Sequence, residues 1–178
     1  MANVMYAGKM ISKDVDTYLS NAIAAQPIKD GSLVVLGNLA ADTTYDNNGL
    51  EYDLYEAAAP VAATDEVVIV DYAGISEGII NGNDYKMGHR LYNLEVPAGV
   101  PMRVRRFALH DKFWLGESNF ETTPVVGEYA GATAGKFTHT PSATIPQTGY
   151  AVKVLLAEDL TTGMRSNGKL YLCEVVQL

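Results

Sequence analysis

The chain has 178 residues, enough to bury a core without disulfide cross-links, and its 48% hydrophobic and 19% charged residues are typical of a folded domain. Its net charge of −8 argues against nucleic acid as a main partner, because binding to a polyanion depends on exchanging counterions for Lys and Arg. No segment has the roughly 20 apolar residues of a membrane span, and the first residues lack the pattern of a secretory signal. We therefore expect synthesis in a cytoplasm and no membrane partner.

The first 30 residues are predicted to form an arm followed by one helix. Residues 1–11 have no core of their own, so we expect them to become ordered against a neighbouring protein. Residues 12–25 then carry apolar side chains at helical spacing, with Ser12 as a cap at the start. Pro27 ends this helix, because a proline cannot continue it.

Residues 31–178 are predicted to form a β domain. Short runs rich in Val, Ile, Leu and Tyr are separated by Gly, Asn, Asp and Pro. About ten such strands after one helix predict a mainly β fold, a barrel or sandwich of short strands with one N-terminal helix. The strands fill one domain, or two interlocked β portions, about 31–85 and 86–178. The predicted strands are 33–36, 51–55, 67–70, 90–96, 101–107, 124–129, 136–140, 150–156 and 169–176.

Charge is divided unevenly along the chain. Between Lys29 and Lys86 there is no basic residue, while eleven carboxylates occupy this interval. A basic belt follows, which predicts a surface that attracts acidic partners. The belt consists of Lys86, Arg90, Arg103, Arg105, Arg106 and Lys112, with His89 and His110.

Part of the belt is predicted to be an exposed strand face. On a strand, Arg103 and Arg105 point one way and Val104 and Arg106 the other, so two guanidiniums stand side by side. Guanidiniums bind carboxylates through bidentate hydrogen bonds. We expect those carboxylates to come from another protein or from the acidic part of a neighbouring copy, between Lys29 and Lys86.

The aromatic residues beside these arginines have two interpretations. Phe107, Phe113 and Trp114 can anchor the centre of a protein contact, since aromatic side chains are enriched at binding hot spots. Alternatively, they belong to the protein's own core and the arginines are a solvated rim.

Several patterns in the sequence are candidate sites for chemistry. Residues 42–53 hold carboxylates and asparagines suited to calcium, but the essential positions of an EF-hand loop are not acidic, so a tight turn at Asn47–Gly49 is preferred. Residues 131–137 resemble a phosphate loop but have three residues between the glycines instead of four. Cys173 lies in an alternating run and is predicted to be a buried structural thiol. No catalytic site, metal site or cofactor is predicted.

The histidines add no metal motif. None has a second ligand at the close spacing that zinc sites use, and the chain has no Gly-x-Ser-x-Gly nucleophile motif. Folding can still bring distant residues into an active site, so an enzyme on a β-barrel remains an alternative. The three histidines are His89, His110 and His139.

The pattern of strands and turns resembles the capsid decoration, or cement, proteins of tailed bacteriophages. The resemblance implies a small β-rich protein without enzymatic activity, which sits on the outer capsid surface and strengthens contacts between capsomers. It also implies the virion as location after synthesis in the host cytoplasm, the major capsid protein as partner, and a homo-oligomer, often a trimer. The stretches that carry it are Gly31–Gly37, Val126–Tyr129, Gly135–Thr138, Tyr150–Val154 and Tyr171–Val176.

The basic belt and the arm are the hypothesised contacts to the capsid or to another subunit. Two other classes stay open: a different head, tail or connector component of the virion, and a carbohydrate-binding β-sandwich with Trp114 as its stacking platform. The hypothesised contact residues are Arg103, Arg105, Arg106, Lys112, Trp114, Met5 and Tyr6.

Overall fold

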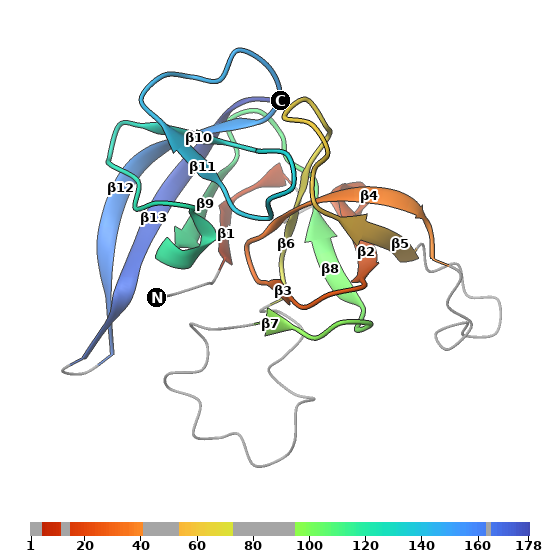
Figure 1. The fold of residues 1–178 in the computed structure, drawn as a ribbon. Helices are drawn as coiled ribbons and strands as arrows, with labels where there is room; N and C mark the ends of the chain where they lie inside the picture. Colours follow the sequence, from red (N-terminus) through yellow and green to blue (C-terminus); the bar gives the residue numbers. More distant parts are fainter. Residues whose placement is uncertain (1–4, 12–14, 41–53, 73–94, 163–164) are drawn as a thin grey trace.

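The fold is a six-stranded antiparallel sheet beside a closed five-stranded barrel (Figure 1). The computed structural model describes residues 5–11, 15–40, 54–72, 95–162 and 165–178. The prediction of a mainly β fold is confirmed. The sheet consists, in spatial order, of β1 (Met5–Lys9), β9 (Lys112–Gly116), β13 (Arg165–Gln177), β12 (Ala151–Thr162), β10 (Tyr129–Gly131) and β11 (Thr140–Ser142).

The barrel closes because its first strand pairs on both sides. β2 (Leu19–Ala24) runs parallel to β5 (Leu54–Ala58) and antiparallel to β8 (Met102–Arg105), while the other barrel pairs are antiparallel. A separate pair, β3 (Ile28–Lys29) with β7 (Glu95–Val96), lies next to it. The barrel strands, in spatial order, are β2 (Leu19–Ala24), β5 (Leu54–Ala58), β4 (Leu33–Leu39), β6 (Val68–Val70) and β8 (Met102–Arg105).

Two hydrophobic cores share one wall, formed by β4 and β6. Val34 and Val68 belong to the core inside the barrel, whereas Leu33 and Ile69 belong to the core between the barrel and the sheet. This alternation follows from the two-residue period of a strand. Because both faces of β6 and of the start of β4 face a core, residues 33–36 and 67–70 form continuous apolar runs in the sequence. The sheet contributes to the core between barrel and sheet; its residues there include Phe113, Leu115, Tyr171, Cys173 and Val175.

The predicted N-terminal helix is wrong for the described part of residues 12–25. Asp16–Tyr18 forms a short 3-10 segment, η2, and the following residues form β2. In β2 the small side chains of Ala22 and Ala24 are buried in the narrow barrel interior. Pairing with two strands satisfies the β2 backbone, so tertiary contacts override a local helical pattern. Residues 12–14 lie outside the described residues.

Part of the predicted arm belongs to the sheet. Met5–Lys9 forms the edge strand β1, which pairs antiparallel with β9. The side chain of Met5 is buried in the core between sheet and barrel. The predicted division near 85/86 falls in residues 73–94, outside the described residues, and the barrel takes strands from both sides of it.

A buried carboxylate links the sheet to the barrel. Asp30 is fully buried, and its side chain accepts hydrogen bonds from the backbone N–H of Met5 (2.9 Å) and of Tyr72 (2.8 Å). The Asn119 side-chain amide donates to the backbone carbonyl of Asp30 (2.5 Å). Burial raises the pKa of Asp30 to about 7, although the backbone donors oppose this effect. Protonation of this group is therefore linked to folding near neutral pH.

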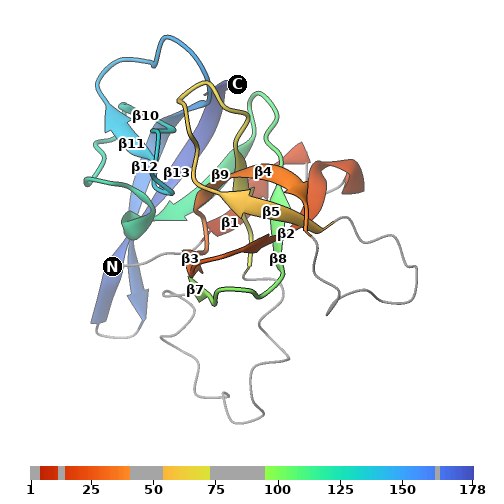
Figure 2. The ribbon, with the colours of Figure 1, turned by 45° about the vertical axis from the view of Figure 1, so that its right-hand side comes forward.

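The two views place the long β12–β13 hairpin on the side of the molecule away from the barrel (Figures 1 and 2). In the described part of the chain, no helix has the length and apolar character to cross a membrane.

Replacing Asp30 by Asn is expected to remove a pH-dependent contribution to the free energy of unfolding. With a pKa near 7 in the folded state and 3.8 as the ordinary value, the folded chain holds a proton between these pH values that the unfolded chain has lost. The stabilisation is present below about pH 4 and lost as pH rises through 7. Urea unfolding from pH 4 to 8 should show the advantage of the wild type over Asp30→Asn falling as pH rises, by at most about 1.4 kcal/mol per pH unit.

The quantity to compare is the difference in unfolding free energy between wild type and Asp30→Asn. Each protein alone is not informative, because His139 changes the stability with pH in the opposite direction. Burial lowers the pKa of His139 to about 4 from 6.5, so this residue destabilises the fold as pH falls between those values. His139 is common to both proteins and cancels in the difference. A difference that stays constant from pH 4 to 8 would contradict the expected role of Asp30.

Candidate functional site

The outward face of the sheet carries a row of apolar side chains. Along β9 and β13, alternate residues are buried in the core, and the residues between them face outward. The cross-strand pairs Tyr6–Trp114, Trp114–Leu172 and Leu172–Leu156 place four of these side chains next to each other on four strands. Tyr6 and Leu156 are 40% and 43% exposed, and the two residues between them are half-buried. We name Tyr6, Trp114, Leu172 and Leu156 the apolar row.

A basic row runs beside the apolar row on the same face. Its residues pair in register from β1 across β9, β13 and β12 to β10. Lys112 Nζ lies 3.8 Å from a carboxylate oxygen of Glu174, and Lys153 Nζ lies 5.8 Å from the centre of the Tyr129 ring. With three cations to one carboxylate, the row is positive in a chain of net charge −8. The basic row consists of Lys9, Lys112, Glu174, Lys153 and Tyr129.

A bulge in β1 places Lys9 in this row. The register of β1 against β9 shifts between Ala7 and Lys9, so the extra residue Gly8 turns Lys9 to the outward side, opposite Lys112. A Cβ at Gly8 would lie 2.6 Å from the backbone oxygen of Lys112. Glycine is therefore required for the close approach of the two strands.

Three of the hypothesised contact residues meet on this face. Tyr6, Lys112 and Trp114 come together because β1 pairs with β9, although they are far apart in sequence. Buried aromatic groups surrounded by polar residues are the usual centre of a protein–protein interface. An apolar row flanked by lysines fits a partner surface that presents apolar side chains beside carboxylates.

The expectation that Arg103 and Arg105 form an exposed contact is wrong for Arg105. The two guanidiniums do lie on one side of β8, since Val104 points into the barrel core. Their carboxylate, however, comes from the same chain: Asp71 binds Arg103 Nη2 at 2.7 Å and also binds Arg105 Nε. Arg105 is 6% exposed. A loop carboxylate after β6 thus occupies the position that a partner was expected to fill.

Other hypothesised contact residues belong to the core. Met5, the first residue of β1, points into the core, whereas its neighbour Tyr6 reaches the outward face. Phe107 and Phe113 are also buried, with ring centres 5.5 Å apart. The core interpretation therefore holds for these two aromatic residues, while Trp114 faces outward. Lys86, His89 and Arg90 of the basic belt lie outside the described residues.

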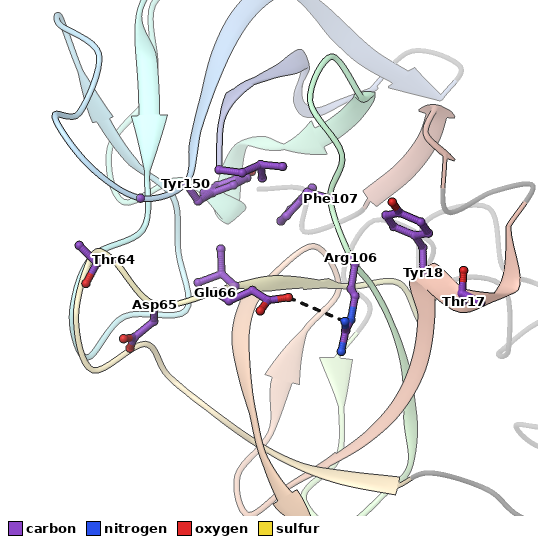
Figure 3. A pocket seen from close by; sticks show the side chains of 11 residues that line it. Thr17, Tyr18, Thr64, Asp65, Glu66, Arg106, Phe107 and Tyr150 are labelled. Carbon is purple, nitrogen blue, oxygen red and sulfur yellow. Dashed lines mark ion pairs between the residues drawn. The ribbon is translucent and has the colours of Figure 1, made fainter.

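Arg106 lies apart from the other two arginines and lines a pocket between barrel and sheet (Figure 3). Its side chain is 46% exposed, and its Nη1 lies 3.9 Å from Glu66 Oε1. The same pocket is lined by the aromatic residues Tyr18, Phe107 and Tyr150. The cavity has a volume of about 430 Å³.

The reactive residue types have structural surroundings. Cys173 is buried, as predicted, and burial raises the pKa of its thiol. His139 is enclosed in the core, with Nε2 3.4 Å from the Gly31 carbonyl and Nδ1 3.5 Å from the Tyr150 hydroxyl. Among the residues that the structure describes, no group of three His, Cys, Asp or Glu side chains could hold a metal ion. Residues 42–53, weighed as a calcium loop, lie outside them.

The sequence reasoning missed most of the outward face and the pocket. Alternation in 112–116 and 171–176 was available as a signal for Leu172 and Glu174, and that in 150–156 for Lys153. The pairing of β1 with β9 had no comparable signal. In comparisons with known protein families, curated protein sequences and solved structures, nothing matched the chain. The function proposed below rests on the geometry of the chain and on the resemblance that its sequence shows.

Replacing Asp71 by Ala is expected to cost about 3–5 kcal/mol of unfolding free energy, because it leaves the charge of Arg105 buried without its carboxylate. Glu66→Ala is the matched control: it removes the carboxylate of an exposed arginine pair and should cost only ~0–1 kcal/mol. Urea unfolding of both variants gives the comparison. Equal and small losses would show that the Asp71 cluster does not stabilise the fold.

Proposed function

We propose that this chain is a non-enzymatic structural protein of a tailed-bacteriophage virion. In this proposal it binds the outer capsid surface and reinforces contacts between major capsid protein subunits. The observation that supports it best is the outward sheet face, where the apolar row and the basic row lie side by side across four strands. A rigid sheet holds these side chains in place before binding, which reduces the entropy lost on association.

The chemistry of this face fits a protein partner. Tyr6 and Trp114 are the two residue types most often found at energetic centres of interfaces, and they pair directly across β1 and β9. Lys9, Lys112 and Lys153 lie along one side of the apolar row and make that side positive, which favours carboxylates on the partner. The proposed contacts therefore keep Tyr6, Lys112 and Trp114 and transfer the remaining role from the arginines to these lysines and Leu156.

Reinforcement of a shell depends on the number of contacts as well as on their individual strength. A homo-oligomer, such as a trimer, presents one such face per copy, and the linked contacts give an avidity above that of any single face. Mass measurement of the purified chain tests this part of the proposal. A strictly monomeric chain would restrict it to single-site binding.

Replacing Leu156 by Asp is expected to weaken binding to capsids at least tenfold, or about 1.4 kcal/mol. The reason is that a carboxylate at the β12 end of the apolar row is desolvated in the contact without a partner. Leu39→Asp, at a 61% exposed position on β4, is the matched control and should bind normally. Binding is measured by co-sedimentation with heads assembled from the major capsid protein of the same genome.

The two possible failures have different meanings. If wild type binds these heads and Leu156→Asp binds equally well, the outward sheet face is not the contact. If wild type does not bind heads at all, the capsid function itself is wrong.

A further inference from the structure

The apolar row of the outward sheet face runs across the strands and is narrow along them. It takes one side chain from each of four neighbouring strands, in the order β1, β9, β13 and β12. Along β9, the next outward positions beside Trp114 are Lys112 on one side and Gly116, which has no side chain, on the other. Leu170 widens the row on β13. The longest apolar contact on this face therefore follows the row.

The members of the row are held at the spacing of the strands. Their side chains point away from the core, because the neighbours of Trp114 within its strand, Phe113 and Leu115, are fully buried. Neighbouring strands lie about 4.8 Å apart, so the three intervals between Tyr6 and Leu156 span about 14 Å. The face thus offers an apolar side chain at each of four regular steps.

This shape fits an α-helix better than the other elements of a protein partner. The apolar stripe of an amphipathic helix offers one side chain per turn, about every 5.4 Å, which is close to the step of the row. On an extended strand, side chains on one side repeat only about every 6.7 Å. A second sheet packs through a broad apolar face, whereas a helix touches a sheet along one line.

The charges beside the row define which flank of the helix is acidic. Lys9, Lys112 and Lys153 lie two positions or more along the strands from the apolar row, at a lateral distance of about 7 Å. A helix with its side chains has a radius of about 5–6 Å, so residues on its flank reach this distance. On the other side of the row the exposed outward residue of β12 is Glu158, which opposes an acidic flank there.

We propose that the outward sheet face binds an amphipathic α-helix of the major capsid protein. The helix lies across the strands, with its apolar stripe on the apolar row and carboxylates on the flank above the basic row. This inference rests on the proposed function and names the element of the partner that this face recognises. The described part of this chain contains no α-helix, so a second copy does not supply the helix from those residues.

Photo-cross-linking on assembled heads tests the inference. The full chain carries p-benzoyl-L-phenylalanine in place of Tyr6 or of Leu156, at the two ends of the row, and is irradiated on heads of the major capsid protein. Mass spectrometry should place both cross-links in one segment of that protein, about ten residues apart, because a helix rises about 1.5 Å per residue. An extended segment of the same length would separate them by about four residues.

Two further positions make this measurement decisive. Glu158, the next outward residue of β12, carries the probe if the substitution at Leu156 prevents binding. Leu39, which is 61% exposed on β4 of the barrel, is the control and should give no cross-link to the capsid protein.

The acidic flank is tested by charge reversal. Lys112→Glu combined with Lys153→Glu should weaken binding to heads by at least about tenfold, because like charges then face each other. Lys29→Glu, at an exposed position of β3 beside the barrel, is the matched control and should bind like wild type.

The outcomes separate this inference from the proposed function. If the wild type does not bind heads, the proposed function fails and the inference fails with it. If heads are bound but the cross-links lie about four residues apart, in separate segments or in another copy of this chain, the helix alone is overturned. Normal binding of the double lysine variant would overturn the acidic flank.

Discussion

The shared wall of β4 and β6 is the constraint on which the remaining structure depends. β6 and the first residues of β4 are buried on both faces, so the barrel interior and the core under the sheet cannot be repacked independently. The sheet is thereby held against the barrel by its inner face, and its other face is left to carry Tyr6, Trp114 and the lysines. The same contact between the two parts creates the pocket that Arg106 lines, whose walls come from both. Site and scaffold are therefore consequences of one packing arrangement.

The three arginines at positions 103, 105 and 106 show how strongly surroundings decide the role of a charge. Arg105 is enclosed and neutralised by Asp71, and Arg103 shares the same carboxylate from a more open position. Arg106, one residue further on, has only a long contact to an exposed carboxylate. A buried charge must be paired within the fold, whereas a solvated one is available to a ligand. Identical residue types are thus buried and paired at one position and exposed to solvent at the next.

Elements that depend on local sequence could be predicted, whereas features that depend on contacts between distant residues could not. Strands such as 33–36, 67–70 and 150–156 were recognised because local apolar runs and turn residues mark them. The helix at 12–25 was predicted wrongly, since the pairing of β2 with β5 and β8 overrides the local pattern. The partner of Arg105 was also beyond local reasoning, because Asp71 is 34 positions away. Trp114 and Lys112 were recognised as surface candidates from residue type, but only the register of β1 against β9 shows which neighbours they have.

The edge strand β1 has a further consequence for how the molecule is assembled. It precedes the other described strands in the chain, yet its pairing partner is β9, and Ile11 just after it is bonded to Asp111, 100 positions later. Contacts of such long range slow the folding of small β proteins, because closing the intervening chain costs entropy. We therefore expect β1 to dock after strands that pair with near neighbours in the sequence. Until it docks, the adjoining edge of β9 is an unpaired template to which a strand of another molecule can add.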